Sequence, residues 1–256
     1  MLKEIRLFSL LMVLFMHSAG ASFVDIVSQI KPSVVGVGVH TPTSQPQNIL
    51  RGTGFVIGNG HYIVTNAHVL PAILDDKLLQ KIAVFIGSGK NANVRGAEVI
   101  ASSSLYDLAV LKISGKALPA MTLAKKQFYA DGSAIAFTGF PMGAVLGLYP
   151  VTHRGIIASV TPSVVPAVSA DTINLTMLKR MKNPYLVYQL DATAYPGNSG
   201  SAMYDITSGD VVGIINKVFV QSTKEAVISN PSGITYAIPV KYLHEVLQEN
   251  AINIDN

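Results

Sequence analysis

The 256-residue chain contains no cysteine, so it forms no disulfide bond and cannot be a thiol enzyme. Charged residues make up only 13% of it. The basic ones are scattered, apart from Lys179, Arg180 and Lys182, and no basic stripe with interleaved aromatic residues is present. No Cys/His set has the spacing of metal ligands. We therefore expect no nucleic-acid partner, no metal and no other cofactor.

The sequence also lacks an apolar run long enough for a comfortable membrane span. Its first residues instead have the pattern of a secretory signal. Lys3 and Arg6 precede a short apolar core from Leu7 to Met16, and Ala19-Gly20-Ala21 offers a small-residue cleavage site. We predict that residues 1–21 are a signal peptide, which places the mature protein in the periplasm or outside the cell. Retention of this segment as an anchor is the alternative.

Glycine, β-branched residues and apolar residues are plentiful, as in β-rich globular proteins. Two series of strand-like segments are separated by a weakly patterned connector at residues 118–129, which predicts an all-β fold of two β-barrels. We place the barrels at about residues 33–115 and 131–240, within one domain that spans residues 22–256.

The first series comprises segments at residues 33–40, 52–57, 61–66, 81–87, 93–102 and 106–113. The second comprises segments at residues 133–139, 149–160 (one or two strands), 185–191, 211–220 and 233–239. Apolar periodicity predicts short helices at residues 23–30 and 240–250. The mixed stretch from Thr161 to Pro184 is predicted to be a large surface loop, and loops of that length are often functional, so a regulatory role is open.

The heptapeptide from Tyr195 to Ser201 places Ser199 between two glycines, with a proline upstream. Glycine permits positive φ and close backbone approach, and proline starts a turn. Such a loop can hold a hydroxyl in a cleft and aim backbone N–H groups at one point, as acyl transfer requires. Taken alone, the heptapeptide is more often an ordinary turn between strands than a catalytic loop.

A histidine and an aspartate precede this serine, each where a predicted strand meets a loop. His68 follows the segment at residues 61–66, and Asp107 opens the segment at residues 106–113. A serine hydroxyl needs a base, imidazole suits that role near neutral pH, and a carboxylate orients the imidazole. The order His, Asp, Ser is weak evidence by itself, because most chains of this length contain it.

Five sequence blocks together resemble the HtrA/DegP-like branch of the trypsin-fold serine proteases, in that family's order. They are Gly52–Ile57, Thr65–Val69, Asp107–Lys112, Pro196–Gly200 and Gly233–Pro239. The resemblance implies two six-stranded antiparallel barrels. It also implies that His68 is the general base, Asp107 its orienting acid and Ser199 the nucleophile. The oxyanion hole would be formed by the backbone N–H groups of Gly197 and Ser199, in a loop shaped by Asn198.

The same resemblance locates a substrate pocket. The strand that ends in Ile215-Asn216-Lys217 corresponds to the pocket wall, and Thr193 lies near the pocket base. We predict these four residues as substrate-binding, with an apolar wall that suits a small or medium aliphatic side chain. His40, His61, His153 and His244 lie outside the matching blocks and are predicted to be structural or surface residues. Asp191 is expected to support the serine loop.

Two features depart from the family pattern. Behind the nucleophile stands Ser201-Ala202 instead of glycine and proline, a feature shared with glutamyl endopeptidases of the same fold, which leaves the substrate class open. The chain also ends soon after the helix predicted at residues 240–250, so we expect no PDZ module and no activation through one.

The sequence therefore predicts a serine endopeptidase that cleaves protein or peptide substrates. By resemblance, these substrates are unfolded or flexible proteins in extracytoplasmic quality control, and a homotrimer is compatible with the family. The competing hypothesis is a catalytically silent or latent protease fold that acts as a chaperone or binding protein.

Overall fold

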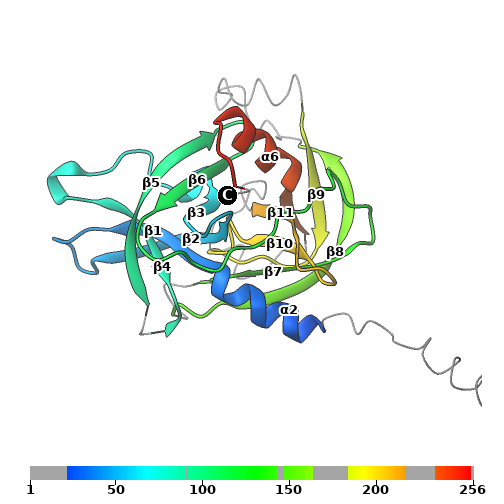
Figure 1. Ribbon diagram of the computed structural model, residues 1–256, viewed down its shortest axis with the longest axis horizontal. Coiled ribbons are helices and arrows are strands. Elements are labelled where there is room, and N and C mark those ends of the chain that lie inside the picture. Colours follow the sequence, from blue (N-terminus) through cyan, green and yellow to red (C-terminus); the bar gives the residue numbers. More distant parts are fainter. Residues whose placement is uncertain (1–21, 90–91, 143–146, 164–183, 217–233, 255–256) are drawn as a thin grey trace, which may run out of the picture.

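The computed structural model describes residues 22–89, 92–142, 147–163, 184–216 and 234–254. The predicted signal segment and most of the predicted loop between Thr161 and Pro184 lie outside these residues, as does Lys217. The described elements form two closed antiparallel β-barrels of six strands each, which lie side by side in Figure 1. The predicted fold class is thereby confirmed.

The first barrel has the strand order β1-β2-β3-β6-β5-β4. Its strands are β1 (Val34–His40), β2 (Asn48–Ile57), β3 (Tyr62–Asn66), β4 (Lys81–Ile86), β5 (Asn93–Ser103) and β6 (Leu108–Ile113). All six follow the predicted segments, although β2 begins earlier because Asn48 still pairs with His40 of β1. Apolar side chains from five of the strands fill the interior, including Val37, Val56, Ile63, Val84 and Leu111.

The second barrel has the strand order β10-β11-β12-β9-β8-β7. Its strands are β7 (Ala134–Gly139), β8 (Val151–Pro162), β9 (Leu186–Asp191), β10 (Ala202–Asp205), β11 (Val211–Asn216) and β12 (Ile234–Pro239). The segment at residues 149–160 is a single strand, β8. It extends through Thr161 and Pro162, which pair with Val187 and Leu186, so the loop begins later than predicted.

Strand β10 has no counterpart among the predicted segments. It is four residues long, and Ala202, Met203 and Tyr204 are all buried. The other strands were predicted from runs of β-branched and apolar residues, whereas β10 has no β-branched residue and is too short to show a pattern of its own. The strand closes the barrel by pairing with β11 and β7 directly behind the serine loop.

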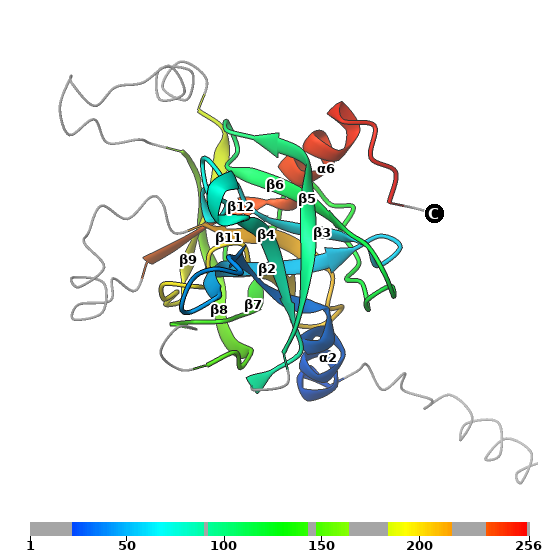
Figure 2. The same ribbon diagram turned by 90° about the vertical axis from the view of Figure 1, so that its left-hand side faces the viewer.

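Two short helices flank the barrels on opposite sides, as both Figure 1 and Figure 2 show. Helix α2 (Phe23–Ile30) begins at a capping box, in which the Ser22 and Asp25 side chains each bond the other's backbone N–H. Helix α6 (Val240–Glu249) follows β12 without a break and buries an apolar face that includes Leu243 and Val246. Because α6 contacts both β5 and β11, it bridges the two barrels.

Candidate active site

His68 and Asp107 form a hydrogen-bonded pair in the first barrel. His68 lies in a short 3₁₀ turn, η3 (Ala67–Val69), directly after β3, and Asp107 directly precedes β6. His68 Nδ1 is 2.6 Å from Asp107 Oδ2, and the backbone N–H of His68 donates to Asp107 Oδ1 at 2.9 Å. Both carboxylate oxygens therefore hold the same residue, which fixes the imidazole and leaves its Nε2 for other chemistry.

The backbone at Asp107 has a left-handed conformation, with φ of 55°. A non-glycine residue adopts this conformation only where its surroundings impose it. Here the Asp107 carbonyl accepts from Ala67 N–H and from Asn66 Nδ2, each at 3.1 Å. Asn66, the last residue of β3, pairs with Leu108, the first residue of β6. This pairing brings the neighbouring residues Ala67 and Asp107 close together.

The serine loop packs against the end of β3, immediately before His68. Gly200 has φ of 86°, and a Cβ at this position would lie 2.1 Å from Thr53 O and 2.5 Å from Thr65 Oγ1. Gly197 has φ of 100°, and a Cβ there would lie 2.2 Å from Phe140 O. Both glycines are therefore required by conformation and by space, as the Gly-framed heptapeptide predicts.

Gly52 lies where the histidine turn approaches the serine loop. A Cβ on Gly52 would be 2.7 Å from Val69 Cγ2 and 2.9 Å from Ser199 O. Thr53 N–H donates to Ser199 O at 2.9 Å. The structure therefore brings the His68 turn and the Ser199 loop together across the junction of the two barrels, although they are far apart in the sequence.

Thr53 supports the serine loop, a role that the sequence analysis did not identify. Its hydroxyl donates to Gly197 O at 2.7 Å and accepts from Phe140 N–H at 3.0 Å, and its carbonyl accepts from Thr65 Oγ1 at 2.7 Å. This fully buried side chain thus joins the serine loop to the end of β7. Thr53 is the one polar residue of the predicted segment at residues 52–57, and this was the available signal, because buried hydroxyls need partners.

The residues predicted to bind substrate fall in different places. Thr193 is half-buried on the segment that leads into the serine loop. Ile215 is fully buried, and its backbone supports that loop by accepting from Gly200 N–H at 3.0 Å and donating to Ser201 O at 2.9 Å. The Asn216 side chain donates to Asp107 Oδ2 at 2.8 Å. Asn216 is therefore a hydrogen-bond partner of the His–Asp pair. The sequence analysis predicted it only as a substrate-binding residue.

The other described histidines lie away from this pair. His40 contacts Asn48, His61 bridges Asn59 and Gly115 O, and His244 contacts Ala124 O. His153 stacks on Phe137 at 4.9 Å, and burial lowers its pKa. Asp191, on β9, pairs with Ile156 and Ile234 in the sheet. Among the described residues, no cluster of His, Asp and Glu has the form of a metal site.

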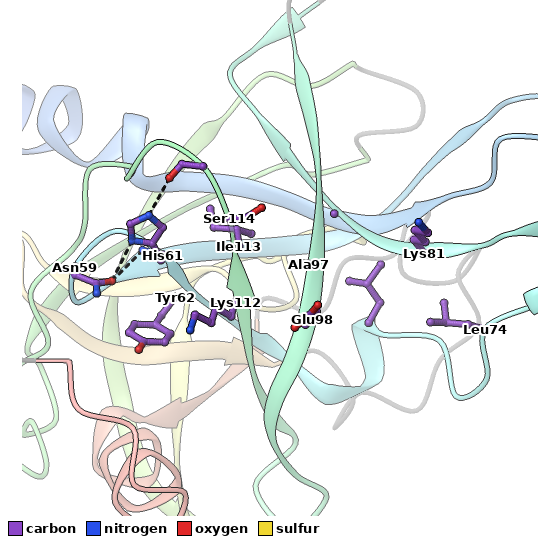
Figure 3. Close-up of a pocket in the computed structure, with 13 residues that line it drawn as sticks. Asn59, His61, Tyr62, Leu74, Lys81, Ala97, Glu98, Lys112, Ile113 and Ser114 are labelled. Atoms are coloured by element: carbon purple, nitrogen blue, oxygen red, sulfur yellow. Dashed lines mark hydrogen bonds between the residues drawn. The ribbon is translucent and has the colours of Figure 1, made fainter.

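A hollow of about 850 Å³ lies on the first barrel, where strands β3 to β6 and the loops next to them meet. Figure 3 shows its lining side chains, among them Tyr62, Lys81, Glu98 and Lys112. It contains none of His68, Asp107 or Ser199. We therefore do not take this hollow as the candidate active site. That site is the junction of the two barrels, where the His–Asp pair and the serine loop lie.

Two six-stranded barrels that meet at a His–Asp pair and a Gly-framed serine loop are the architecture of chymotrypsin-type serine proteases. The sequence matches the trypsin-like peptidase domain family over residues 52–214. The chain belongs to this family, and the resemblance seen in the five sequence blocks is confirmed.

Similar proteins point to one branch of the family. A probable periplasmic serine endoprotease, DegP-like, from Halomonas elongata is 29% identical over 198 residues, which cover 77% of this chain and 34% of that protein. A protein of the same description from Chlamydia muridarum is 28% identical over 211 residues, which are 81% of this chain and 35% of that protein. The chain thus spans about a third of the length of the curated relatives it matches.

Solved structures agree with this placement. The serine endoprotease from Yersinia pestis superimposes with a TM-score of 0.62 at 26% identity, covering 90% of this chain and 66% of that one. An HtrA-type protease solved with a tripeptide gives a TM-score of 0.65 at 28% identity, covering 91% of this chain and 64% of that one.

Proposed function

We propose that this protein is a serine endopeptidase in which Ser199, His68 and Asp107 form the catalytic triad. The observation that carries the proposal is the His68–Asp107 pair, held by both carboxylate oxygens beside the Gly-framed loop of Ser199. Asp107 fixes the imidazole tautomer with Nδ1 protonated, so Nε2 is the free base that takes the Ser199 proton. Ser199 Oγ then attacks the scissile carbonyl and forms the acyl-enzyme, which water hydrolyses.

The same loop supplies the donors for the oxyanion. Asn198 N–H is occupied by Tyr195 O at 3.0 Å, and Gly200 N–H by Ile215 O at 3.0 Å. The backbone N–H groups of Gly197 and Ser199 donate no hydrogen bond to any other described residue. Two unoccupied N–H groups on either side of a buried Asn198 are what a developing oxyanion requires.

The substrates and location are proposed from the relatives. Both the DegP-like proteins and the solved neighbours are named as proteases, and the DegP-like proteins are named as periplasmic. We infer that this chain cleaves protein substrates, unfolded ones in particular, in the periplasm or outside the cell. Neither described helix is long and apolar enough to cross a membrane. Assembly into a trimer remains a prediction.

The test uses a fluorophosphonate probe and casein hydrolysis with the purified protein. The wild type should be labelled and should cleave casein, and Ser199→Ala should lose both. Ser208→Ala is the matched control, since Ser208 lies in an exposed turn between β10 and β11. A folded wild type that is neither labelled nor active would support the competing hypothesis of a silent chaperone or binding protein.

A further inference from the structure

Tyr106, the residue directly before Asp107, is held by a cluster of aromatic rings. Its ring stacks on Tyr242 of α6, with centroids 4.6 Å apart and planes inclined by 28°. Tyr185 meets it edge-on at 5.3 Å and 88°. Aromatic pairs in these arrangements stabilise beyond the area they bury. The Tyr106 ring is therefore fixed between the C-terminal helix and the start of β9.

The hydroxyl of Tyr106 is fixed as well. It donates to Glu245 Oε2 on α6 at 2.9 Å, and Lys241 lies 3.5 Å from the other oxygen of that carboxylate. Burial, and next the hydrogen bond to Glu245, raise the pKa of Tyr106. The phenol therefore keeps its proton over the neutral and alkaline range. It remains a hydrogen-bond donor at every pH at which a His–Asp pair is expected to function.

Because Tyr106 directly precedes Asp107 in the chain, fixing Tyr106 also restrains the backbone of Asp107. The φ of Asp107 measures rotation about the bond that joins its Cα to the peptide shared with Tyr106, and it has the left-handed value of 55°. On the other side Leu108 is fully buried and paired with Asn66 and Ser103. A residue in this conformation relaxes unless both neighbours are held. Tyr106 is the neighbour held from outside the first barrel.

We propose that Tyr106 is a positioning residue for the catalytic acid, and that helix α6 holds Asp107 in its left-handed conformation through Tyr242 and Glu245. The proposal builds on the proposed function, since it assigns Asp107 to the triad. Figure 1 shows α6 lying beside β5 and β6 of the first barrel as well as β11 of the second. The C-terminal helix is thus part of the support of the active site, through the residue that precedes Asp107 in the chain.

The experiment compares variants that remove one or both parts of the anchor. Tyr106→Phe removes only the hydrogen bond, and Tyr106→Ala removes the ring as well. Tyr188→Phe is the matched control, because it removes the phenol of a fully buried tyrosine outside the anchor, whose hydroxyl accepts from Tyr129 N–H at 2.9 Å. Activity, thermal stability and the NMR resonance of the His68 Nδ1 proton are measured for each.

We expect kcat to fall about threefold to tenfold in Tyr106→Phe and about a hundredfold in Tyr106→Ala, with KM within about twofold of the wild type. The proton in the short His68–Asp107 hydrogen bond resonates far downfield, and both variants should shift or broaden that resonance. Tyr188→Phe should retain the resonance and a kcat within about twofold of the wild type, even if it lowers the melting temperature.

Two results would overturn the proposal. One is a normal resonance and normal kcat in both Tyr106 variants. The other is a loss of kcat in Tyr188→Phe as large as in Tyr106→Phe, in proportion to lost stability, which would show that Tyr106 affects activity only through the general stability of the protein. If the wild type proves inactive, the resonance of the His68 Nδ1 proton still reports whether Tyr106 positions Asp107. Failure of this proposal can therefore be distinguished from failure of the proposed function.

Discussion

Asn216 and His68 share one oxygen of Asp107. Asn216 Nδ2 donates to Asp107 Oδ2 at 2.8 Å, and His68 Nδ1 lies 2.6 Å from the same atom. Asn216 is the last residue of β11 in the second barrel, whereas Asp107 and His68 belong to the first. This hydrogen bond therefore fixes the carboxylate from the opposite barrel, and the site depends on how the barrels pack.

Substituting Asn216 should impair catalysis with little change in substrate affinity. In Asn216→Ala the carboxylate loses a donor of the kind that contributes about 1.5–3 kcal/mol, and we expect kcat/KM to fall about tenfold. In Asn216→Asp a second carboxylate would face Asp107, and the loss should be larger. Asn250→Ala is the control, because its amide bonds only Val246 O within α6 and the turn that follows. Full activity of Asn216→Asp would contradict this role.

Thr53→Val should weaken both stability and activity. The substitution leaves Gly197 O without its donor and Phe140 N–H without its acceptor in a fully buried position, at a cost of about 1–3 kcal/mol each. Because Gly197 belongs to the proposed oxyanion loop, the rate of fluorophosphonate labelling should fall as well. Thr53→Ser should restore both properties.

Thr138→Val provides a comparison for Thr53→Val. Thr138 is equally buried, and its hydroxyl contacts Thr152 and Tyr204 instead of the serine loop. We expect a similar loss of melting temperature with the labelling rate preserved. Equal loss of labelling in the two variants would show that Thr53 acts only through global stability.

Ser201 and Gly139 should show strong coupling in a double-mutant cycle. A Cβ on Gly139 would lie 2.2 Å from Ser201 Oγ and 2.9 Å from Asn198 Oδ1, so Gly139→Ala should destabilise the protein by about 1–3 kcal/mol. The Ser201 hydroxyl has no hydrogen-bond partner among the described residues, so its removal should change the free energy of unfolding little. Ser201→Gly should therefore rescue much of the loss, as measured by urea unfolding. Strictly additive effects would refute the contact.

His153 should make stability depend on pH. Burial lowers its pKa below the value of about 6.5 that it has in an unfolded chain. As the pH falls through 6.5, the unfolded chain binds the proton first, so the free energy of unfolding decreases until the folded pKa is passed. The urea midpoint should fall less between about pH 7.5 and 5.5 in His153→Phe than in the wild type. An NMR titration midpoint of the His153 ring at or above 6.5 would contradict the argument.

The locally encoded features were accessible from the sequence. Runs of β-branched and apolar residues predicted the strands of the first barrel, and the Gly-framed Ser199 loop follows from the conformations that glycine alone adopts easily. Strand β10 was missed because it has only four residues, none of them β-branched, directly behind the serine loop. Burial explains why the contact of Asn216 was missed. All residues of β11 are buried, so no periodicity indicates which of their side chains faces Asp107.

The chemical groups that this chain has available were thus readable in its residues: a serine between glycines, a histidine and an aspartate at strand ends, and no cysteine. The tertiary structure alone decided which groups meet. The hydrogen bond from Asn216 to Asp107 spans 109 positions of the chain, and that from Thr53 to Gly197 spans 144. Such contacts arise from barrel closure and barrel packing, which are set by the summed burial of many side chains and leave no local pattern at the residues they join.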